Sequence, residues 1–320
     1  MSVTSISVRE KILITTGKLV KIAVVRGEDW SEGEDVADPE LFIAKLREGG
    51  LKADIFAFSQ KLPNTQPKYR YHMEWGNVAA IPLTIYKDWW EKRLPKVTRK
   101  SVRRGYKRGV VATVAPFDDE LVKGIVSIHN ETVIKQGEPF AHYGKEFNVV
   151  KQEYGTYPDR SEFLGAYYEN ELIGIIKLVY MGKIASIMQI ISKVAHYDKR
   201  PTNILIAKAV EVCAEKGMSY LIYGSYIYGK KTNSPLTEFK RRTGFEQINV
   251  PRYYIPLSLK GKVIIKLKLH RGLIGILPES IINFLLELRT RYYQIKLGSV
   301  GKAQGVNQGE SMTDAGGKDD

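Results

Sequence analysis

The chain has 320 residues, enough to bury a substantial core as one large domain or two moderate ones. Its hydrophobic content of 43% and charged content of 26% are those of an ordinary soluble globular protein. The 49 Lys and Arg residues against 35 Asp and Glu give a formal charge of +14. That charge fits a nucleic acid, a membrane surface or a phosphate-bearing cofactor as partner, or a basic protein that binds none of these.

The same sequence excludes several classes of protein. Cys213 is the single cysteine, so no internal disulfide and no cysteine-cluster metal site is expected. The five histidines have no paired ligand spacing, and Walker, dinucleotide-binding and G-x-S-x-G motifs are absent, so no metal is predicted. The first ten residues have no signal-like apolar core, and no apolar run reaches the roughly 18 to 20 residues that span a bilayer. We therefore expect a cytoplasmic protein.

The N-terminal part is predicted to alternate strands with one helix. Residues 11–15 and 19–25 read as a hairpin joined around Gly17. Asp38 is a typical N-cap and Pro39 a typical first helical residue, so a short helix is expected to start there. Further strands are predicted at 53–58 and, as a pair turning at Gly76-Asn77, within 69–82.

The middle of the chain is predicted to contain a long hairpin and then a strand–helix–strand crossover. A helical stretch from Tyr86 runs into a basic segment, and a second helix and a polar loop are expected at 118–137 and 138–160. The hairpin covers 163–180 and turns at the polar residues 169–171. Then come a strand at 184–194, a helix at about 203–216 and a strand at 220–228.

The C-terminal part is predicted to be simpler. A short segment, 239–245, ends in Gly244-Phe245, and a last strand is expected at 253–259. An amphipathic helix at about 279–296 presents a broad apolar face, and residues 298–320 have the composition of a disordered tail.

This order of elements resembles the GNAT acyltransferases and, more closely, the Fem-type (FemAB-like) aminoacyltransferases and their bacterial acetyltransferase relatives. The resemblance covers roughly residues 70–260 and is carried by five segments, namely the hairpin, the helix start Lys199–Asn203, the strand 220–228, the closing segment 239–245 and the basic segment 99–110. It implies an α/β fold with a GNAT-like mixed sheet flanked by helices, in one or two GNAT-like lobes, plus a C-terminal amphipathic helix. The implied division is an N-terminal α/β lobe (1–95), a GNAT-like catalytic lobe (96–260), the amphipathic region (261–297) and the tail (298–320).

The residues that would bind the acyl donor lie mainly at the start of the crossover helix. A helix N-terminus offers free N–H groups and partial positive charge, and GNAT proteins that bind coenzyme A have a Gly-rich turn there. Pro201 removes a donor in this chain, and no glycine permits a close approach of phosphate. In this departure the chain resembles the Fem-type proteins, whose donor is aminoacyl-tRNA. The predicted donor-binding residues are Gln189, Lys199, Arg200, Thr202, Asn203, Ser225 and Lys240.

The basic segment is the candidate for binding a second anionic group. It carries six cations between Arg99 and Arg108 and no acid, and at helical spacing these cations form two adjacent rows. A phosphate-rich acceptor or a tRNA backbone would offset their repulsion, whereas a solvated basic face is the alternative. We assign substrate binding to Arg99, Arg103, Lys107 and, on the loop further along, Tyr143.

Three residues are candidates for proton transfer. Glu138 or His142, on a loop, would deprotonate an acceptor amine, and Tyr228, on the strand after the crossover helix, would act as general acid. His142 and Tyr228 each have an ordinary structural alternative, which is a surface histidine for His142 and a packed strand residue for Tyr228.

The predicted activity is therefore direct N-acyl transfer to a primary amine without a covalent enzyme intermediate, with acyl-coenzyme A as donor. The alternatives are a Fem-type transferase that uses aminoacyl-tRNA on a cell-envelope precursor, and a non-catalytic module that binds an anionic partner. The amphipathic helix at 279–296 is a candidate for peripheral membrane contact or dimerisation. We expect instead that its apolar face packs on the catalytic lobe.

Overall fold

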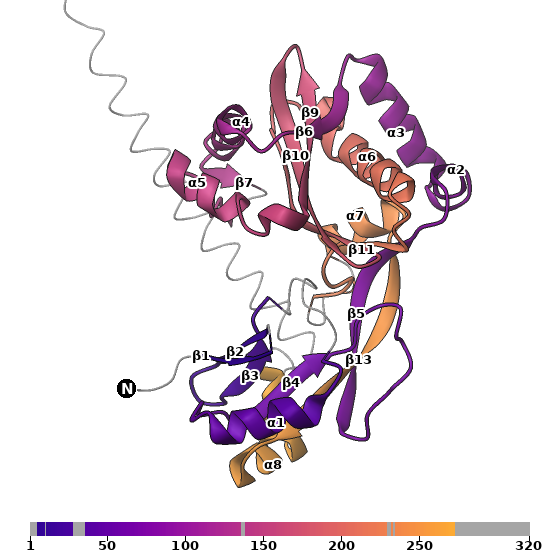
Figure 1. The fold of residues 1–320 in the computed structure, drawn as a ribbon. Helices are drawn as coiled ribbons and strands as arrows, with labels where there is room; N and C mark the ends of the chain where they lie inside the picture. The colour runs from indigo at the N-terminus through magenta and orange to yellow at the C-terminus, as the bar shows by residue number, and fades with distance from the viewer. Residues whose placement is uncertain are drawn as a thin grey trace, which may run out of the picture.

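The computed structural model describes residues 5–9, 11–27, 36–135, 138–228, 232 and 234–272. Within this part of the chain, eleven strands form one mixed sheet (Figure 1). In spatial order they are β1 (Ser5–Val8), β2 (Lys11–Thr16), β3 (Ile22–Val25), β4 (Ile55–Ser59), β13 (Glu246–Pro256), β5 (His72–Pro82), β12 (Tyr220–Ile222), β11 (Ile184–Ser192), β10 (Glu171–Met181), β9 (Ser161–Tyr168) and β6 (Val111–Ala115). A separate two-stranded ribbon pairs β7 (Ile134–Lys135) with β8 (Glu138–Pro139).

Helices cover both faces of the half of the sheet that contains β6 and β9–β12. On one face lie α3 (Lys96–Lys107) and α6 (Pro201–Glu215), together with α2 (Tyr86–Asp88), the π-helical turn Trp89–Arg93 and α7 (Pro235–Arg242). On the other face lie α4 (Asp119–His129) and α5 (Phe147–Tyr154). The two cores follow the alternation of β10, because Ile176 packs in the α6 core and Ile175 in the α4–α5 core.

The other half of the sheet has its own core. Helix α1 (Pro39–Glu48) packs against β1–β4 and β13, where Phe42, Phe56, Phe58 and Tyr253 form an aromatic cluster. Helix α8 (Leu259–Lys266) packs on Ile55 from a different side. The long strands β5 and β13 pair from His72–Tyr254 to Ala80–Glu246 and join the two halves, as Figure 1 shows.

Much of the predicted order of elements is confirmed. The first hairpin is present as β2 and β3, and Asp38 caps α1 by accepting a hydrogen bond from the Leu41 N–H. The long hairpin is β9–β10, and the crossover is β11–α6–β12 with parallel pairing. The expected mixed sheet flanked by helices is therefore the observed fold. The domain boundaries remain predictions, and the expected helix at 279–296 and tail at 298–320 lie outside the described residues.

Several predicted elements are wrong. The segment 69–82 contains one strand, because Gly76 and Asn77 pair with Val250 and Asn249 in the middle of β5. The polar region 138–160 contains helix α5, whose buried Val150 and Tyr154 are one turn apart. The remaining differences are in length: the helix predicted for 118–137 ends at His129, the strand predicted for 220–228 ends at Ile222, and the last strand is 246–256. In the described residues, no helix has both the length and the apolar character needed to cross a membrane.

Candidate active site

Two neighbouring strands separate in the middle of the sheet. Strands β11 and β12 pair only from Ile184–Tyr220 to Ser186–Ile222. Beyond that point the chain after β12 follows β5, since the Tyr223 N–H donates to the Ala79 carbonyl. Strand β11 instead stays on β10 as far as Ser192. We call the place where β11 and the loop 223–228 separate the notch.

A β-bulge lies in β11 beside this notch. Lys177 of β10 pairs with Gln189, but the next residue, Leu178, pairs with Ile187, so Met188 is the extra residue. The Lys177 Nζ donates to the Tyr154 carbonyl at 2.7 Å, which places this pair on the α5 side of the sheet. The Oε1 atom of Gln189 is buried there and accepts no hydrogen bond in the described part of the chain. Such an acceptor is satisfied by ordered water or by a bound group, and the donor-binding role of Gln189 stays a prediction.

The other wall of the notch, loop 223–228, is held by side chains from distant elements. Asn77 of β5 bonds both ways to Ile227, accepting its N–H at 2.7 Å and donating to its carbonyl at 3.3 Å. Gly224 adopts a left-handed conformation (φ +55°), and a Cβ there would lie 2.4 Å from the Tyr228 hydroxyl. The loop is therefore fixed in position although it is not a strand.

Lys240 supports the same loop from beneath. We predicted that it binds donor phosphate, and the structure places it in the protein interior, where its Nζ donates to the Ser225 carbonyl at 2.6 Å. The ammonium lies 4.7 Å from the Tyr228 ring centre and 4.5 Å from that of Tyr223. Burial lowers the pKa of Lys240 to about 8. Its observed contacts are those of a positioning residue for the loop.

Tyr228, the predicted general acid, lies at the exposed end of this loop. Its ring is about half exposed. Burial of part of the ring raises the pKa of its hydroxyl, and the hydrogen bond from the Ser225 backbone opposes that rise. The hydroxyl is therefore protonated at neutral pH, as a general acid must be.

Backbone N–H groups at the start of α6 are mostly engaged within the protein. Pro201 has none, and Arg200 is left-handed (φ +57°). The N–H groups of Asn203 and Ile204 both donate to the Arg200 carbonyl, at 3.1 and 3.3 Å. Those of Lys199 and Arg200 donate to preceding carbonyls in the 3₁₀ turn Tyr197–Lys199. This helix start thus lacks the open row of donors that binds a pyrophosphate.

A carboxylate of the protein binds the loop just before this helix. Glu131, after α4, accepts the N–H of Val194 at 2.5 Å and that of Ala195 at 2.7 Å. Two adjacent amides that bind a carboxylate form an anion site already filled by the chain itself.

Side chains at the start of α6 are arranged around the end of β11. The Thr202 and Ser192 hydroxyls are 3.0 Å apart, and Lys135 of β7 donates to the Ser192 carbonyl at 2.9 Å. Lys199 lies over the Tyr168 ring, 4.5 Å from its centre. Arg200 is exposed and Asn203 half-buried, so both are accessible from the helix start.

Helix α3 places the predicted basic rows beside this helix start. Gly105 lies against α6, where a Cβ would be 2.5 Å from the Lys199 carbonyl oxygen. Arg99 donates to the Trp90 carbonyl at 2.8 Å, and Arg103 lies 5.6 Å from the Trp90 ring centre, so this row is partly engaged with the protein. The exposed cations of the helix are Lys96, Lys100, Arg103, Arg104 and Lys107.

His142 belongs to a separate cluster beside α4 and α5. Its ring centre is 4.8 Å from that of His129, and its Nδ1 lies 3.1 Å from the Lys145 Nζ, which in turn pairs with Glu153. Burial, and then the charge of Lys145, lower the pKa of His142. Because Lys145 donates to Nδ1, the neutral ring carries its proton on Nε2 and has no free lone pair. In the described part of the chain, no hydrogen bond or ring contact joins this cluster to Tyr228.

The remaining predicted site residues lie near this cluster. Glu138 is in β8, next to the turn that carries His142, and Tyr143 in that turn is about half exposed. His129, which sequence reasoning passed over, is fully buried with its Nε2 3.2 Å from the Tyr154 hydroxyl. Burial lowers the pKa of His129 to about 4.

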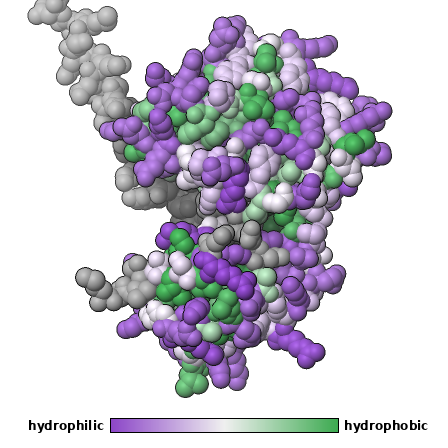
Figure 2. All heavy atoms as spheres, viewed as in Figure 1, coloured by the Kyte–Doolittle hydropathy of each residue, from purple (hydrophilic) through white to green (hydrophobic). Residues whose placement is uncertain are grey.

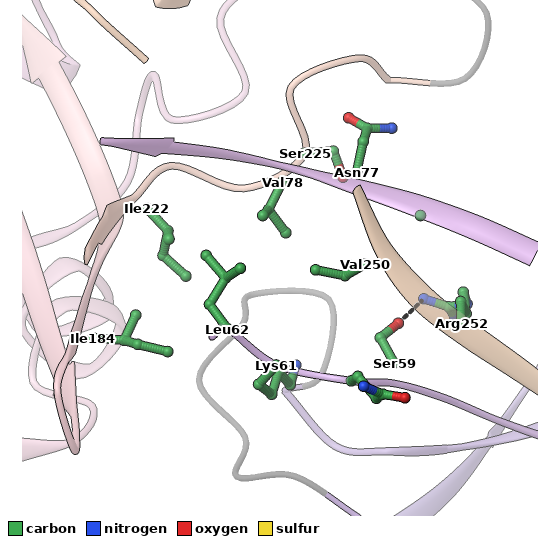
Figure 3. Close-up of a pocket in the computed structure, with 12 residues that line it drawn as sticks. Ser59, Lys61, Leu62, Asn77, Val78, Ile184, Ile222, Ser225, Val250 and Arg252 are labelled. Atoms are coloured by element: carbon green, nitrogen blue, oxygen red, sulfur yellow. Dashed lines mark hydrogen bonds between the residues drawn. The ribbon is translucent and has the colours of Figure 1, made fainter. Parts of the chain in front are cut away.

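A pocket of about 110 Å³ opens where the two halves of the molecule meet (Figure 3). In Figure 3, Leu62, Ile184 and Ile222 lie at one side of the pocket and Val250, Ser59 and Arg252 at the other. The side chains of Ile184 and Gln189 lie on the same face of the sheet, which is the face opposite α6. The pocket therefore lies on the same face as Gln189.

One group of potential metal ligands lies away from the notch. His72, Glu74 and His270 are close enough to surround one ion, although their sequence spacing gave no such indication. Arg271, however, donates to both oxygens of Glu74, at 2.9 and 3.1 Å, and His270 donates to one of them. A cation at this carboxylate would face the guanidinium, so we interpret the group as an ion-pair cluster that fixes the end of the described chain on β5.

Sequence reasoning missed the residues that shape the notch through long-range contacts, above all Asn77 and Glu131. Neither carries a local motif. Asn77 is signalled only as a polar residue inside a predicted strand pair, and Glu131 only as an acid inside a predicted helix.

No protein-family model matches the sequence, and no curated protein matches it significantly. Solved structures do match in fold. The structure of FemX aligns over 80% of this chain and 85% of its own, at 11% identity and a TM-score of 0.56. The C-terminal domain of a protein described as a lysylphosphatidylglycerol synthetase from Agrobacterium fabrum aligns over 83% and 87%, at 14% identity and a TM-score of 0.52. A GCN5-related N-acetyltransferase from Kribbella flavida aligns over 79% and 89%, at 11% identity and a TM-score of 0.38. The alignments with FemX and with the synthetase domain confirm the predicted Fem-type, GNAT-like fold: the chain has the fold of FemX.

Proposed function

We propose that the protein is an aminoacyltransferase that moves an aminoacyl group from aminoacyl-tRNA to a primary amine of a cell-envelope precursor. The amine nitrogen attacks the ester carbonyl and forms an amide bond. The bond between that carbonyl and the ribose oxygen breaks, and the ribose hydroxyl leaves with a proton. The ester is already activated, so the protein needs only to position the two substrates and polarise the carbonyl.

The observation that carries this choice of donor is the state of the amides around the start of α6. Coenzyme A would present a pyrophosphate to these amides. Pro201 offers none, the amides of Asn203 and Ile204 are engaged by the Arg200 carbonyl, and those of Val194 and Ala195 bind Glu131. A polyanionic donor can be bound by exposed cationic side chains of the protein. It therefore fits this surface better than coenzyme A, whose pyrophosphate needs free backbone N–H groups.

Helix α3 supports a polyanionic donor. Its C-terminal turn packs against the α6 start at Gly105, and Arg108 pairs with Asp198 of the same loop. The exposed cations of α3 and Arg200 therefore lie on adjoining elements. Phosphates of a tRNA acceptor arm would offset their mutual repulsion.

The chemical roles follow from the two walls of the notch. The buried Oε1 of Gln189 beside the bulge would accept a hydrogen bond from the aminoacyl amine, and a β11 N–H at the bulge would polarise the carbonyl. Tyr228 would protonate the leaving ribose oxygen. We retain His142 or Glu138 as the base; because Lys145 occupies the His142 Nδ1, a proton-accepting His142 requires that contact to break.

A cell-envelope acceptor is supported by one solved structure of this fold, which is described as a lysylphosphatidylglycerol synthetase and so is named for an aminoacylated membrane lipid. The choice of an amine rather than a hydroxyl as the acceptor group follows the sequence-based prediction. The pocket is lined by Leu62, Ile184 and Ile222 and by the polar residues Ser59 and Arg252, which suits a single apolar side chain next to a polar group.

The test is a transfer assay with labelled aminoacyl-tRNA and a cell-envelope precursor fraction. The proposal predicts that label moves to a product stable to mild base, as an amide is and an ester is not. Lys100→Glu with Arg104→Glu should weaken tRNA binding and reduce its salt dependence by about one unit per lost phosphate contact. The same charge reversals at Lys45 and Lys52, both exposed on the other half of the molecule, should leave it unchanged.

The second candidate is acyl transfer from acyl-coenzyme A, which uses the same fold and remains the commoner chemistry among GNAT proteins. Transfer of labelled acetyl groups to an amine, with none from aminoacyl-tRNA, would favour it. Salt-sensitive nucleic-acid binding without transfer of either group would favour the non-catalytic module.

A further inference from the structure

An exposed apolar stripe runs along helix α8, far from the notch. Leu259, Val263 and Leu267 recur every four residues and are 80%, 55% and 59% exposed. On a helix of 3.6 residues per turn, positions four apart lie on one face. Leu19, in the neighbouring turn, is 86% exposed and lies next to this stripe, because Lys260 donates to its carbonyl.

Packing of the helix does not need these side chains. The opposite face of α8 carries Gly261, Ile264 and Ile265, which are buried against Ile55. Gly261 approaches so closely that a Cβ would lie 1.9 Å from the Asp54 carbonyl oxygen. The N-cap Ser258 accepts the Gly261 N–H at 3.0 Å. The helix is thus fixed by one face while another presents apolar groups outward.

Lysines flank the stripe on both sides. Lys262 and Lys266 lie along one edge of it, and Lys260 along the other, as 100° per residue places them. Lys18, Lys21 and Lys268 are exposed nearby. Residues 257–272 contain no acid, and Asp54, the acid beneath α8, is largely buried and paired with Lys260. In Figure 2, hydrophobic and strongly hydrophilic side chains meet at the bottom of the view, where α8 lies in Figure 1.

We propose that this face of α8 docks the protein on an anionic lipid bilayer. Large apolar side chains between lysines are the arrangement that inserts at the headgroup boundary while the cations meet anionic lipids. A protein partner would not require lysines on both sides of a stripe that has no acidic residues, whereas an anionic bilayer would. The proposal is independent of the donor and of the transfer reaction, and it concerns a helix within the described residues.

The test is co-sedimentation of the full chain with vesicles, at low and moderate salt. One set contains equimolar phosphatidylglycerol and phosphatidylcholine, and the other phosphatidylcholine alone. The wild-type protein should bind the anionic vesicles and bind them less in moderate salt. The triple variant L259N/V263N/L267N should lower the partition coefficient about tenfold or more. Val97→Asn with Val111→Asn, at exposed apolar positions on the other half of the molecule, is the matched control and should bind as the wild type does.

A second variant keeps the proposal testable if the triple variant folds poorly. K262E/K266E changes only exposed lysines and should abolish the preference for anionic vesicles. Equal binding by the wild type and both variants would overturn the proposal, as would absence of wild-type binding to anionic vesicles. A triple variant that loses thermal stability but keeps vesicle binding would mean that another segment of this chain covers the stripe, and it would also overturn the proposal. None of these outcomes depends on aminoacyl transfer, so they are distinct from failure of the proposed function.

Discussion

The carboxylate of Glu131 accepts the backbone N–H of Ala195 at 2.7 Å and so links the end of α4 to the loop that leads into α6. The same carboxylate binds the Val194 N–H. These two bonds fix a loop that would otherwise expose its donors, and they fill an anion site with a group of the protein itself.

Removal of this carboxylate should therefore loosen the loop. We expect Glu131→Ala to lower the free energy of unfolding by about 1 kcal/mol, because two charge-assisted bonds at a partly exposed site are lost. Urea denaturation measures this. Glu120→Ala, which removes an exposed carboxylate of α4, should cost only a few tenths of a kcal/mol by weakening the interaction with the helix dipole. Equal losses in the two variants would contradict the role assigned to Glu131.

Lys240 should make the free energy of unfolding depend on pH in the alkaline range. Its pKa in the folded protein is about 8, below the ordinary value of 10.5, because burial disfavours the charged form. Between these values the unfolded chain binds a proton that the folded protein does not, so stability rises with pH across this window. Lys240→Met should remove that rise. Urea denaturation of both proteins from pH 7.5 to 10.5 tests it, and parallel pH profiles would refute the prediction.

His129 should confer sensitivity to acid. Burial lowers its pKa from 6.5 to about 4, so below pH 6.5 the unfolded chain takes up a proton that the folded protein refuses. Stability contributed by the neutral ring is present above pH 6.5 and is lost as the pH falls towards 4, by on the order of 2 kcal/mol. His129→Gln should flatten the profile relative to the wild type, as thermal unfolding at pH 4.5 and 7 would measure. The neighbouring His142 is present in both proteins, so their difference isolates His129.

Loss of the Tyr228 hydroxyl should affect turnover rather than binding. We expect Tyr228→Phe to lower kcat about 100-fold with little change in KM, since a general acid acts in the transition state. His142→Ala should lower kcat as well if this residue is the base. Unchanged turnover in both variants would leave the fold intact and the mechanism wrong. Tyr226→Phe, in the same loop, is the matched control.

The hairpin β9–β10 and the crossover β11–α6–β12 could be predicted because their signals are local. Alternating apolar residues, a polar turn and a Gly-terminated helix each specify one element within a few residues. The resemblance to a known fold rested on these elements, and the fold was confirmed.

The walls of the notch could not be predicted in this way. The run from Tyr220 to Tyr228 has the composition of a strand, but Gly224 is left-handed. At Ile227 the backbone N–H donates to the side chain of Asn77, 150 positions away in the sequence, and not to a neighbouring strand. Glu131 reaches Val194 across 63 positions. Lys240 was predicted to face phosphate because its charge suggests an exposed group, whereas three-dimensional packing buries it beneath Ser225. Such contacts depend on tertiary structure, which local propensity does not encode.

The most direct test of the proposed donor is a pair of calorimetric titrations, with charged tRNA and with acetyl-coenzyme A, each at low and moderate salt. We predict saturable binding of charged tRNA that weakens with salt and on Arg200→Ala, and no saturable binding of acetyl-coenzyme A. Saturable binding of acetyl-coenzyme A that weakens on Arg200→Ala, with none of charged tRNA, would contradict the proposal and identify an acyl-coenzyme A-dependent enzyme instead.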